Sequence, residues 1–409
     1  MSLLLLLSYA AQAKSVRALY EIERASVGQQ SGWAVIRDIP EWAKGATIYM
    51  LEGRRVTEEV ASQADDLNGD GVIDELVFRV EFSDDEPSKR VRVVYSDRIV
   101  EHDYQPMVNA QMWLKNEDKS LSEKQMLSST KDDMYRKLHH HGPAFESPYA
   151  AYRLYFDKKQ SIDTYGKQQP DLELRRTMWY STDEQISKGA GHDNLRVFGS
   201  ISVGVLKGWN GKKSRMEHIT EMSSRTMTIR AYGPLRTVVD LCVKGWLYEG
   251  RKVDMTSRYI LYGDGGEVKV ENRIEGEGVD EMLFTTGVMK IKEHLFSQDE
   301  RDGKCAMMTI GEDFPENDTV RWRKERVALA VVLPQNQIVS RIDDAKSYLC
   351  QLRPIDGKID YWFTMEWRKS RFLEWGDDMA GDLALFGERI WRNEALKRPS
   401  GELRVGRVR

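Results

Sequence analysis

Cysteine is scarce in this chain of 409 residues. Its three cysteines, Cys242, Cys305 and Cys350, are far apart and odd in number, so they form neither the ligand spacing of a zinc site nor a disulfide framework. One pair could still form a disulfide in an oxidising compartment. The sequence also lacks a Gly-x-Ser-x-Gly elbow, a phosphate-binding loop, a Rossmann glycine pattern and a His-Glu-x-x-His helix. These absences exclude the commonest hydrolase, kinase, dehydrogenase and zinc-protease sites.

A surplus of positive charge is missing as well. The chain has 61 lysines and arginines against 65 aspartates and glutamates, which gives a net charge of −4. Proteins that bind nucleic acid depend on a surplus of basic side chains, so we expect no nucleic-acid partner. With 41% hydrophobic residues the chain can bury a sizeable core, and its length favours one large domain and a smaller one.

Long hydrophobic runs are absent, and no stretch reaches the length that a membrane span needs. A short run of five leucines near the N-terminus is followed by Ala11-Gln12-Ala13, a small-x-small pattern. Residues 1–13 therefore resemble a secretory signal that is cleaved before Lys14, and we expect a periplasmic or secreted protein. No positive charge precedes the leucines, so a truncated signal and a buried apolar segment are the alternatives.

Aromatic residues, by contrast, are plentiful, with 11 Trp and 17 Tyr. Their rings fill strand cores but also stack on sugar rings, which makes carbohydrate a candidate partner. Short alternating or β-rich segments, TMWYST at 177–182 among them, recur between glycine and asparagine turns. They predict a mainly β fold, a large antiparallel sandwich with a few helices. We expect an N-terminal β-rich segment (14–105), a main sandwich domain with the active site (106–395) and a frayed tail (396–409).

The most specific short motif is the loop that begins at Asp66. Oxygen-bearing side chains recur at alternate positions, and Gly71 stands where such a loop turns sharply; the residues in question are Asp66, Asn68, Asp70 and Asp74. This pattern matches the first nine positions of a calcium loop and predicts a structural Ca²⁺ site. The twelfth position is Val77, where a bidentate glutamate is expected, so Glu75 or another group would have to complete the shell. The alternative is a turn rich in Asp and Asn that binds no ion.

Three adjacent histidines, His139, His140 and His141, stand before Gly142-Pro143, where the chain must turn. In an extended segment His139 and His141 share one side while His140 faces the other. A zinc site would need ligands from elsewhere, with His192 or Glu146 as candidates, and we keep a second metal at this cluster as one hypothesis. Proton transfer needs only one histidine. In the third interpretation the histidines are polar loop residues that take no part in chemistry.

The strand that follows places Arg153, Tyr155 and Asp157 on one face, opposite Tyr152, Leu154 and Phe156. A guanidinium beside tyrosine suits recognition of a carboxylate, and an Arg153–Asp157 pair on a solvated face is the alternative.

Further polar and aromatic groups follow that strand. Tyr165 and Lys167 come next, and a tyrosine close to cations can act as an acid or a base. His192 and Asp193 lie in the glycine-rich turn KGAGHDN, which either presents them to a ligand or simply connects strands. Trp209 begins a Trp-Asn-Gly turn, where its ring could stack on a sugar or cover the core.

Several motifs together carry a family resemblance: HGPAFESPYAAYRLYFDKKQSIDTYGK, TDEQ, GAGHDNLRVFGSISVGVLKGWNG and DDLNGDGVIDELVF. With these the chain resembles the secreted or periplasmic Bacteroidetes proteins grouped as the domain of unknown function 4861, over most of its mature length. The family is associated with polysaccharide utilisation and is similar to an oligosaccharide dehydratase of ulvan breakdown, which removes water from a terminal uronic acid. The resemblance also implies a supersandwich related to galactose mutarotases and lyases.

This resemblance implies a carbon–oxygen lyase that acts on uronate-containing oligosaccharides. Chemistry then assigns roles: a cation neutralises the carboxylate, a base takes the C5 proton and an acid protonates the leaving 4-hydroxyl. Our candidates are Arg153 for the cation, His141 or Tyr152 for the base, and Tyr165 or His192 for the acid. We expect substrate contacts from the remaining candidates, which are His139, Glu146, Lys167, Asp193 and Trp209.

Three other functions stay open. β-Elimination of a glycosidic bond would use the same groups with a sugar as the leaving group. A carbohydrate-binding protein without catalysis is the second, and a mutarotase-like isomerase with Glu146 as its base is the third.

Overall fold

The computed structural model describes residues 13–26, 29–396 and 402–408, so residues 1–12 of the expected signal segment lie outside it. The chain divides into two compact units, one formed by residues 1–104 with 401–409 and the other by residues 105–400. Within the described ranges, no helix is both long and apolar enough to cross a membrane. Each unit has its own hydrophobic core and is described by itself.

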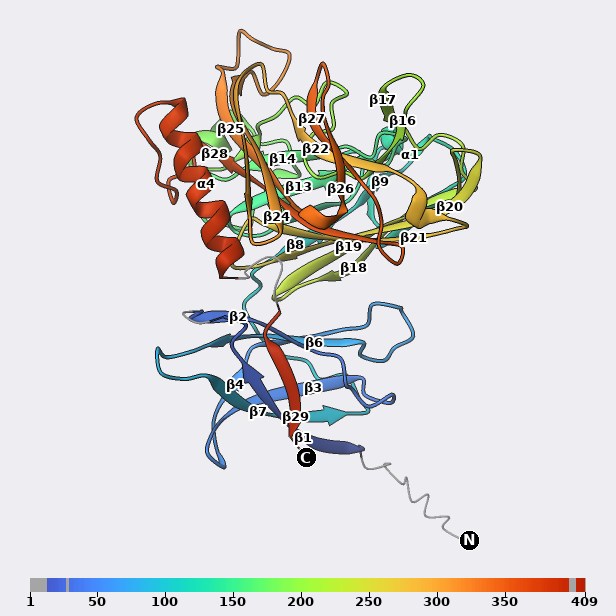
Figure 1. Cartoon of the computed structure of the whole chain (residues 1–409). Helices are drawn as coiled ribbons and strands as arrows, with labels where there is room; N and C mark the ends of the chain where they lie inside the picture. The colour runs from blue at the N-terminus through green and yellow to red at the C-terminus, as the bar shows by residue number, and fades with distance from the viewer. Residues whose placement is uncertain (1–12, 27–28, 397–401, 409) are drawn as a thin grey trace. The chain divides into compact units, whose positions relative to one another are not determined.

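The first unit is a small β-sandwich, drawn in blue with a red C-terminal strand in Figure 1. Its five-stranded sheet has the order β29-β1-β7-β3-β4, and its three-stranded sheet the order β2-β6-β5. Apolar side chains of both sheets meet in one core, because alternate residues of each strand face inward. Its strands are β1 (Ser15–Glu23), β2 (Ser31–Ile36), β3 (Gly45–Glu52), β4 (Arg55–Val60), β5 (Ser62–Asp65), β6 (Glu75–Glu81), β7 (Ser88–Ser96) and β29 (Arg404–Val408).

The C-terminal strand corrects the expected frayed tail. β29 pairs antiparallel with β1, from Leu19 opposite Val408 to Glu23 opposite Arg404. Leu403, just before β29, is buried in the same core, so this segment is held to the first unit by both hydrogen bonds and apolar packing.

The second unit is a larger sandwich built on a nine-stranded antiparallel sheet of order β11-β18-β19-β20-β21-β28-β25-β24-β23. The mainly β, antiparallel fold class is thereby confirmed. The strands of this sheet are β11 (Met126–Ser129), β18 (Ser224–Tyr232), β19 (Arg236–Tyr248), β20 (Arg251–Tyr262), β21 (Val268–Glu275), β23 (Glu293–Arg301), β24 (Lys304–Asp313), β25 (Glu325–Pro334) and β28 (Lys358–Trp367).

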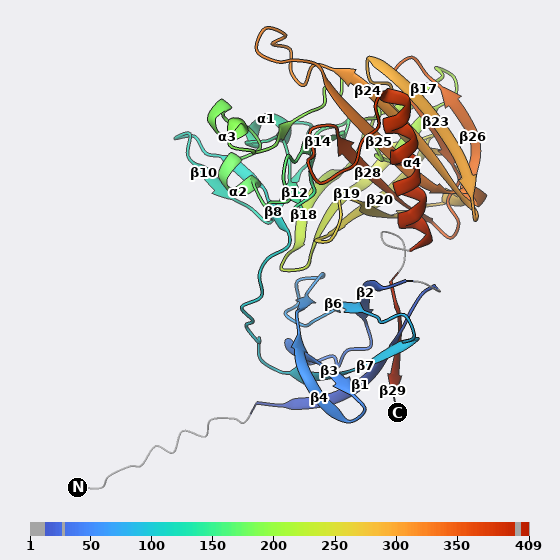
Figure 2. The same cartoon turned by 90° about the vertical axis from the view of Figure 1, so that its left-hand side faces the viewer.

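One face of the nine-stranded sheet carries α4 (Met379–Ala395), which lies across β24, β25 and β28 (Figure 2). Asp378 caps the helix by accepting the Gly381 N–H, and the buried Phe386 and Ile390 recur at a spacing of four residues. They pack on sheet residues such as Ala328 and Trp362. The helix therefore covers this face with a single apolar stripe.

The other face packs on two five-stranded sheets, β15-β14-β13-β12-β8 and β17-β16-β22-β27-β26. Their strands are β8 (Asn109–Gln111), β12 (Ala144–Glu146), β13 (Ala150–Leu154), β14 (Ile162–Gly166), β15 (His192–Asp193), β16 (Lys207–Asn210), β17 (Arg215–Glu217), β22 (Phe284–Met289), β26 (Ile338–Asp343) and β27 (Ser347–Leu352). A short hairpin of β9 (Trp113–Lys115) and β10 (Leu121–Glu123) stands beside them, and α1 (Met134–Lys137) precedes the histidines.

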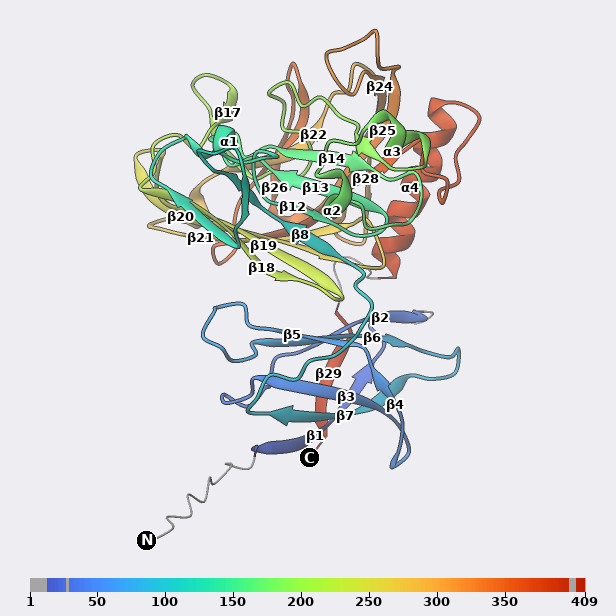
Figure 3. The same cartoon turned by 180° about the vertical axis from the view of Figure 1, so that it is seen from behind.

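The outer face of the sheet that contains β13 is covered by the segment with α2 (Leu174–Thr177) and α3 (Asp183–Ser187), visible in Figure 3. Leu174 and Trp179 pack on Ala144, Ala151 and Tyr165 of the sheet. TMWYST is therefore not a strand, because α2 ends in it and the next residues adopt left-handed backbone angles.

Candidate functional site

Arg153 of β13 lies at the centre of the densest group of polar and aromatic side chains on this outer face. Strand pairing sets it opposite Asp163 of β14, whose Oδ2 accepts hydrogen bonds from Arg153 Nη2 at 2.6 Å and Nε at 3.1 Å. Asp193 of β15 adds a second carboxylate, 2.9 Å from Nη2. Arg153 is only 4% exposed, so both ion pairs form largely out of water.

Three aromatic rings enclose the guanidinium, and with Arg153, Asp163 and Asp193 they form what we call the Arg153 cluster. The rings of Trp179, Tyr155 and Tyr180 lie 4.5, 5.2 and 5.7 Å from it. Trp179 Nε1 donates to Asp193 at 3.0 Å. Tyr155 donates its hydroxyl proton to Asp163 at 2.8 Å, and Arg153 Nη1 donates to the Tyr180 oxygen at 3.1 Å. Tyr180 is 44% exposed, so the cluster opens to solvent at this ring.

Backbone strain accompanies this arrangement. Met178 and Trp179 have φ angles of 50° and 74°, which non-glycine residues seldom adopt, and His141 has a φ of 70°. Such residues cost roughly 1–3 kcal/mol each and tend to gather at functional sites. Three of them within one small region support a functional interpretation of the cluster.

Charge in the cluster is balanced internally. Burial and, after it, the nearby negative charge of Asp163 raise the pKa of Asp193 to about 7, although the positive charge of Arg153 offsets part of the rise. Burial lowers the pKa of Arg153, but Asp163 and the other acidic groups outweigh it, so the guanidinium stays charged. Since its Nε and Nη2 are engaged by aspartates, Arg153 has no free bidentate fork for a substrate carboxylate. Nor does it pair with Asp157, the alternative partner from the sequence.

His139 and His141 border the cluster as half-buried neutral bases. His139 Nε2 lies 3.2 Å from the carbonyl oxygen of Met178, and His141 Nδ1 lies 3.0 Å from that of Tyr135. A carbonyl only accepts, so these nitrogens carry the protons. Burial lowers the pKa of both imidazoles, and the positive charges of Lys115 and Arg153 add to this effect. At neutral pH the bare nitrogens are therefore Nδ1 of His139 and Nε2 of His141.

Both histidines contact the tyrosines of the cluster. The His139 ring lies 5.6 Å from that of Tyr180, and the His141 ring lies 5.6 Å from that of Tyr155 while stacking on Tyr135 at 4.1 Å. His140 instead is fully buried between Gly142 and Gln111, and burial lowers its pKa to about 3. Of the three histidines, the first and third are thus available for chemistry.

Tyr152 and Tyr165, two expected acid–base residues, are structural. Tyr152 lies on the opposite face of β13, where its hydroxyl donates to Gly266 O at 2.6 Å and accepts from Met365 N at 3.1 Å. The Tyr165 hydroxyl bonds to Glu173 at 2.7 Å and to the carbonyl oxygen of Gly191 at 2.8 Å. Both rings are fully buried, and burial raises both pKa values, so neither can exchange a proton with a substrate.

Glu146 and Lys167 also lie beyond the reach of a ligand. They form an ion pair whose side chains are both 0% exposed. Glu146 accepts the backbone N–H groups of Glu173 and Leu174 at 2.8 Å each, and Lys167 donates to the carbonyl oxygen of Asp171 at 2.9 Å. The pair therefore anchors the start of α2 to the sheet, and the structure corrects its expected role in substrate binding.

His192 and Trp209 have surroundings of their own. His192 Nε2 lies 3.2 Å from Glu325, and its ring contacts Trp322 and Trp367 at 4.6 and 4.9 Å. Its neighbour Asp193, by contrast, joins the Arg153 cluster. Trp209 lies in β16 of the other five-stranded sheet and packs against the main core.

The expected metal sites are not preformed. Among the described residues, no three His, Cys, Asp or Glu side chains are arranged to hold a metal ion. In the loop from Asp66, Asp66 accepts the N–H groups of Gly69 and Gly71 at 2.7 Å each, and Asp74 accepts that of Leu67 at 2.7 Å. The loop is thus closed by its own hydrogen bonds. Calcium at this loop and a second metal at the histidine cluster both remain predictions.

Sequence reasoning missed four members of the site, Tyr135, Asp163, Trp179 and Tyr180. Asp163 had a usable signal, since alternation in IDTYG sets it on the same face as Tyr165. The others come from α1 and from the end of α2, and they reach Arg153 only through the tertiary fold.

Comparisons with known proteins give a family and a distant structural likeness. The solved structure of an α-mannosidase from Enterococcus faecalis V583 resembles the chain with a TM-score of 0.39 and 8% identity. The match covers 96% of this chain and 46% of that one, so the chain spans about half the length of the mannosidase. No curated protein matches the chain. The model of the family described as "Domain of unknown function (DUF4861)" matches residues 42–374, and the chain therefore belongs to this family.

Proposed function

We propose that the chain is a carbon–oxygen lyase that removes water from a terminal uronic acid of an oligosaccharide and leaves an unsaturated sugar. The observation that carries the proposal is the pair of neutral histidines, each with a bare ring nitrogen, beside tyrosines that are anchored on a buried arginine. Such an elimination needs a base and a separate proton donor within one site, and this group offers both.

His141 is the proposed base. Its bare Nε2 takes the proton from C5, the carbon next to the carboxylate, and the electron pair of that bond forms the C4–C5 double bond. Negative charge develops on the carboxylate during this step, and nearby cations stabilise it. The positive charge of Lys115 acts on both histidines, which makes it the candidate to face the carboxylate. His139 lies close enough to serve as a second base or as a substrate contact.

Tyr180 is the proposed acid. Its oxygen accepts a hydrogen bond from Arg153, so its own proton is free to pass to the leaving 4-hydroxyl, which departs as water. Burial raises the pKa of Tyr180 although Arg153 lowers it, so the phenol is protonated at neutral pH. Arg153 then acts as a positioning residue: it orients the phenol and supports the charge of the phenolate.

The alternatives fare differently. A mutarotase-like isomerase would need Glu146 as its base, and that carboxylate is sealed in the pair with Lys167. A binding protein would need the aromatic rings but not the two bare nitrogens. Elimination of a glycosidic bond would use the same base and acid. Its products would differ, because the oligosaccharide is shortened by the sugar that leaves.

The test is incubation with uronate-terminated oligosaccharides, following the ultraviolet absorbance of the unsaturated product and its mass. We expect the oligosaccharide to lose the mass of one water molecule and to keep all of its sugar residues. His141→Ala should lower kcat by about 10²–10⁴-fold, the range that general bases contribute. His294→Ala is the matched control, because His294 is also a partly buried imidazole beside a tyrosine, 3.1 Å from the Tyr348 hydroxyl. No absorbance with any uronate oligosaccharide, or full turnover by His141→Ala, would remove the proposal.

A further inference from the structure

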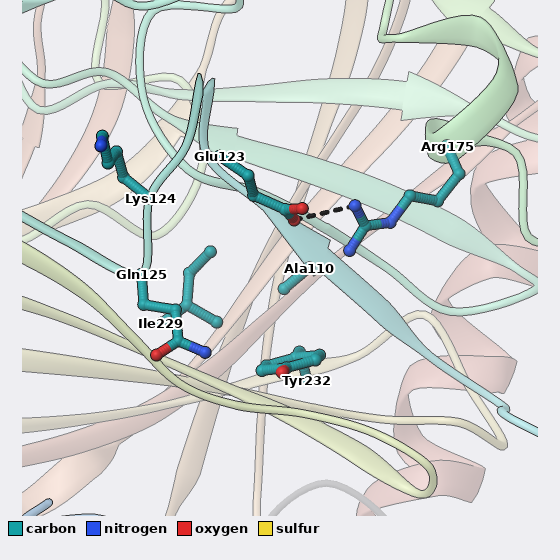
Figure 4. A pocket seen from close by; sticks show the side chains of 7 residues that line it. All are labelled: Ala110, Glu123, Lys124, Gln125, Arg175, Ile229 and Tyr232. Atoms are coloured by element: carbon teal, nitrogen blue, oxygen red, sulfur yellow. Dashed lines mark ion pairs between the residues drawn. The ribbon is translucent and has the colours of Figure 1, made fainter. Parts of the chain in front are cut away.

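A hollow of the larger unit, lined by none of the histidines, has no role in the proposed reaction. It has a volume of about 200 Å³ and is lined by β8, by the turn between β10 and β11, by α2 and by β18. Figure 4 shows Tyr232 with its ring below Ala110, and the side chains of Gln125 and Arg175 on opposite sides. The volume is smaller than that of pockets for drug-sized ligands and suits a single sugar ring or a group of similar size.

The lining combines an aromatic face with hydrogen-bond donors. Tyr232 is 50% exposed, so a broad part of its ring meets solvent beside the apolar Ala110 and Ile229. Gln125 adds an amide donor, whereas the ammonium group of Lys124 points away from the Tyr232 ring in Figure 4. Sugar rings present C–H groups on their faces and hydroxyls around their edges, and this lining offers a partner to each.

The cations of the hollow favour a negatively charged sugar. Arg175 pairs with Glu123 at 2.8 Å, and their side chains are 48% and 40% exposed. Exposed ion pairs of this kind contribute only about 0–1 kcal/mol, so an incoming anion can take over the guanidinium. Arg175 Nε is held by Asn109 Oδ1 at 2.9 Å, which fixes the direction of the side chain. The lining has two basic residues, Arg175 and Lys124, against the single carboxylate of Glu123, and Arg175 is the one that points into the hollow.

The hollow and the histidine site share their supporting elements. The carbonyl oxygen of Trp113, in β9, accepts the backbone N–H of His139 at 2.9 Å, and the Trp113 ring lies 5.9 Å from the Arg175 guanidinium. α2 carries Arg175 and leads directly into Met178, whose carbonyl oxygen fixes the tautomer of His139. A ligand held in the hollow would therefore lie next to the elements that position His139, the second histidine of the proposed site.

We propose that this hollow is a binding subsite for an anionic sugar residue, with Tyr232 as the stacking platform and Arg175 as the partner of its carboxylate or sulfate ester. Its use for a second residue of the same oligosaccharide rests on the proposed function. Binding of a single anionic sugar does not, because it needs no turnover.

Titration calorimetry of the full chain tests the subsite, with D-glucuronate, D-glucose 6-sulfate and neutral D-glucose as probes. At least one anionic probe should bind, and D-glucose should bind at least tenfold more weakly. The two anionic probes distinguish a carboxylate from a sulfate ester. Tyr232→Ala and Arg175→Gln should each weaken binding at least tenfold, while Tyr232→Phe keeps the platform and retains most of it.

Arg176→Gln is the matched control, because Arg176 is the next residue of α2, is 49% exposed and pairs with Asp171. It should bind like the unmodified protein. Absence of binding by both anionic probes, equal binding of glucose, or binding that survives both Tyr232→Ala and Arg175→Gln would each overturn the subsite. The lyase proposal fails on its own measurement, the absence of unsaturated product, and that result leaves the binding test unaffected.

Discussion

Two buried ion-pair groups lie on the same face of one five-stranded sheet, and they differ in what surrounds them. The Lys167–Glu146 pair is fully buried, and both of its members also bond to the backbone around α2. The Arg153 cluster is nearly as buried at its centre, where Arg153 is 4% exposed, but Arg153 also donates a hydrogen bond to Tyr180, which is 44% exposed. Both groups combine a cation and a carboxylate in a low-dielectric environment, where such groups are costly unless they are paired.

The difference teaches that burial of charge does not by itself mark a functional site. The Lys167–Glu146 pair is complete without a ligand, because its hydrogen bonds end on the protein. The Arg153 cluster ends on the phenol of Tyr180, which is 44% exposed, and it is bordered by two imidazoles that each keep one bare nitrogen. Openings of this kind separate groups that hold the fold from groups that can act on a substrate.

The sealed pair should show the largest effect on stability. Lys167→Met leaves Glu146 buried without its cation, so the free energy of unfolding should fall by roughly 3–5 kcal/mol. Lys188→Met is the control, because Lys188 pairs with Glu184 at 2.6 Å with both side chains more than 70% exposed. Removing such a pair should cost about 1 kcal/mol or less. Denaturant unfolding followed by tryptophan fluorescence measures both variants. Equal midpoints would show that the buried pair contributes no more to stability than the exposed pair.

A substitution in the Arg153 cluster should lower kcat more than it lowers stability. Arg153→Lys keeps a positive charge but loses the planar fork, and with it the bond to Tyr180. A hydrogen bond to a charged group is worth about 1.5–3 kcal/mol, so we expect a decrease in kcat of about tenfold to hundredfold. KM should change little, because Arg153 supports the acid and does not touch the substrate.

Arg225→Lys is the control for that measurement. Arg225 is 0% exposed and pairs with Asp132 at 3.4 Å, so it is a buried arginine outside the cluster. This variant should lose stability and retain kcat. A similar fall of kcat in both variants would mean that Arg153 acts through folding alone.

Strand alternation and turn residues in the sequence predicted much of the fold, and they assigned the residues of β13 to the correct faces of the sheet. The face with Tyr152 lies in the core, and the face with Arg153 carries the cluster. The partners of Arg153 were harder to foresee, because they come from β14, from the end of α2 and from β15. Strand alternation says which way a side chain points, and only the tertiary fold decides what it meets.

Two misassignments have the same origin. Glu146 looked like a base, but its hydrogen bonds come from the backbone at 173 and 174, which no local pattern announces. The tail was expected to be frayed, yet its residues 404–408 form β29 and extend a sheet by pairing with β1. Both depend on contacts between residues that are distant in the sequence.

The pH dependence of stability should separate the two groups again. The pKa of Asp193 is raised to about 7 in the folded chain, above its ordinary value near 4. Between these values the folded state binds the extra proton, so this carboxyl makes stability fall as pH rises from about 4 to 7. Asp193→Asn should remove that contribution, and the difference in unfolding free energy between variant and unmodified protein should grow in favour of the variant over this range. A difference that does not change with pH would contradict the raised pKa.

The comparison extends to a third carboxylate group, the exposed loop from Asp66 to Asp74, where the smallest effect is expected. Its oxygens already accept backbone N–H groups, so calcium would add to a turn that forms without it. With a dissociation constant of about 10⁻⁴–10⁻³ M, as in extracellular modules, about 1 mM calcium adds only on the order of 1 kcal/mol. Calcium should therefore raise the melting temperature by a few degrees after chelation, and Asp70→Asn should abolish the rise. If neither the chelator nor calcium changes the melting temperature, the loop binds no calcium and is a turn held by its own hydrogen bonds. Like the Lys167–Glu146 pair, it would then be complete without a ligand.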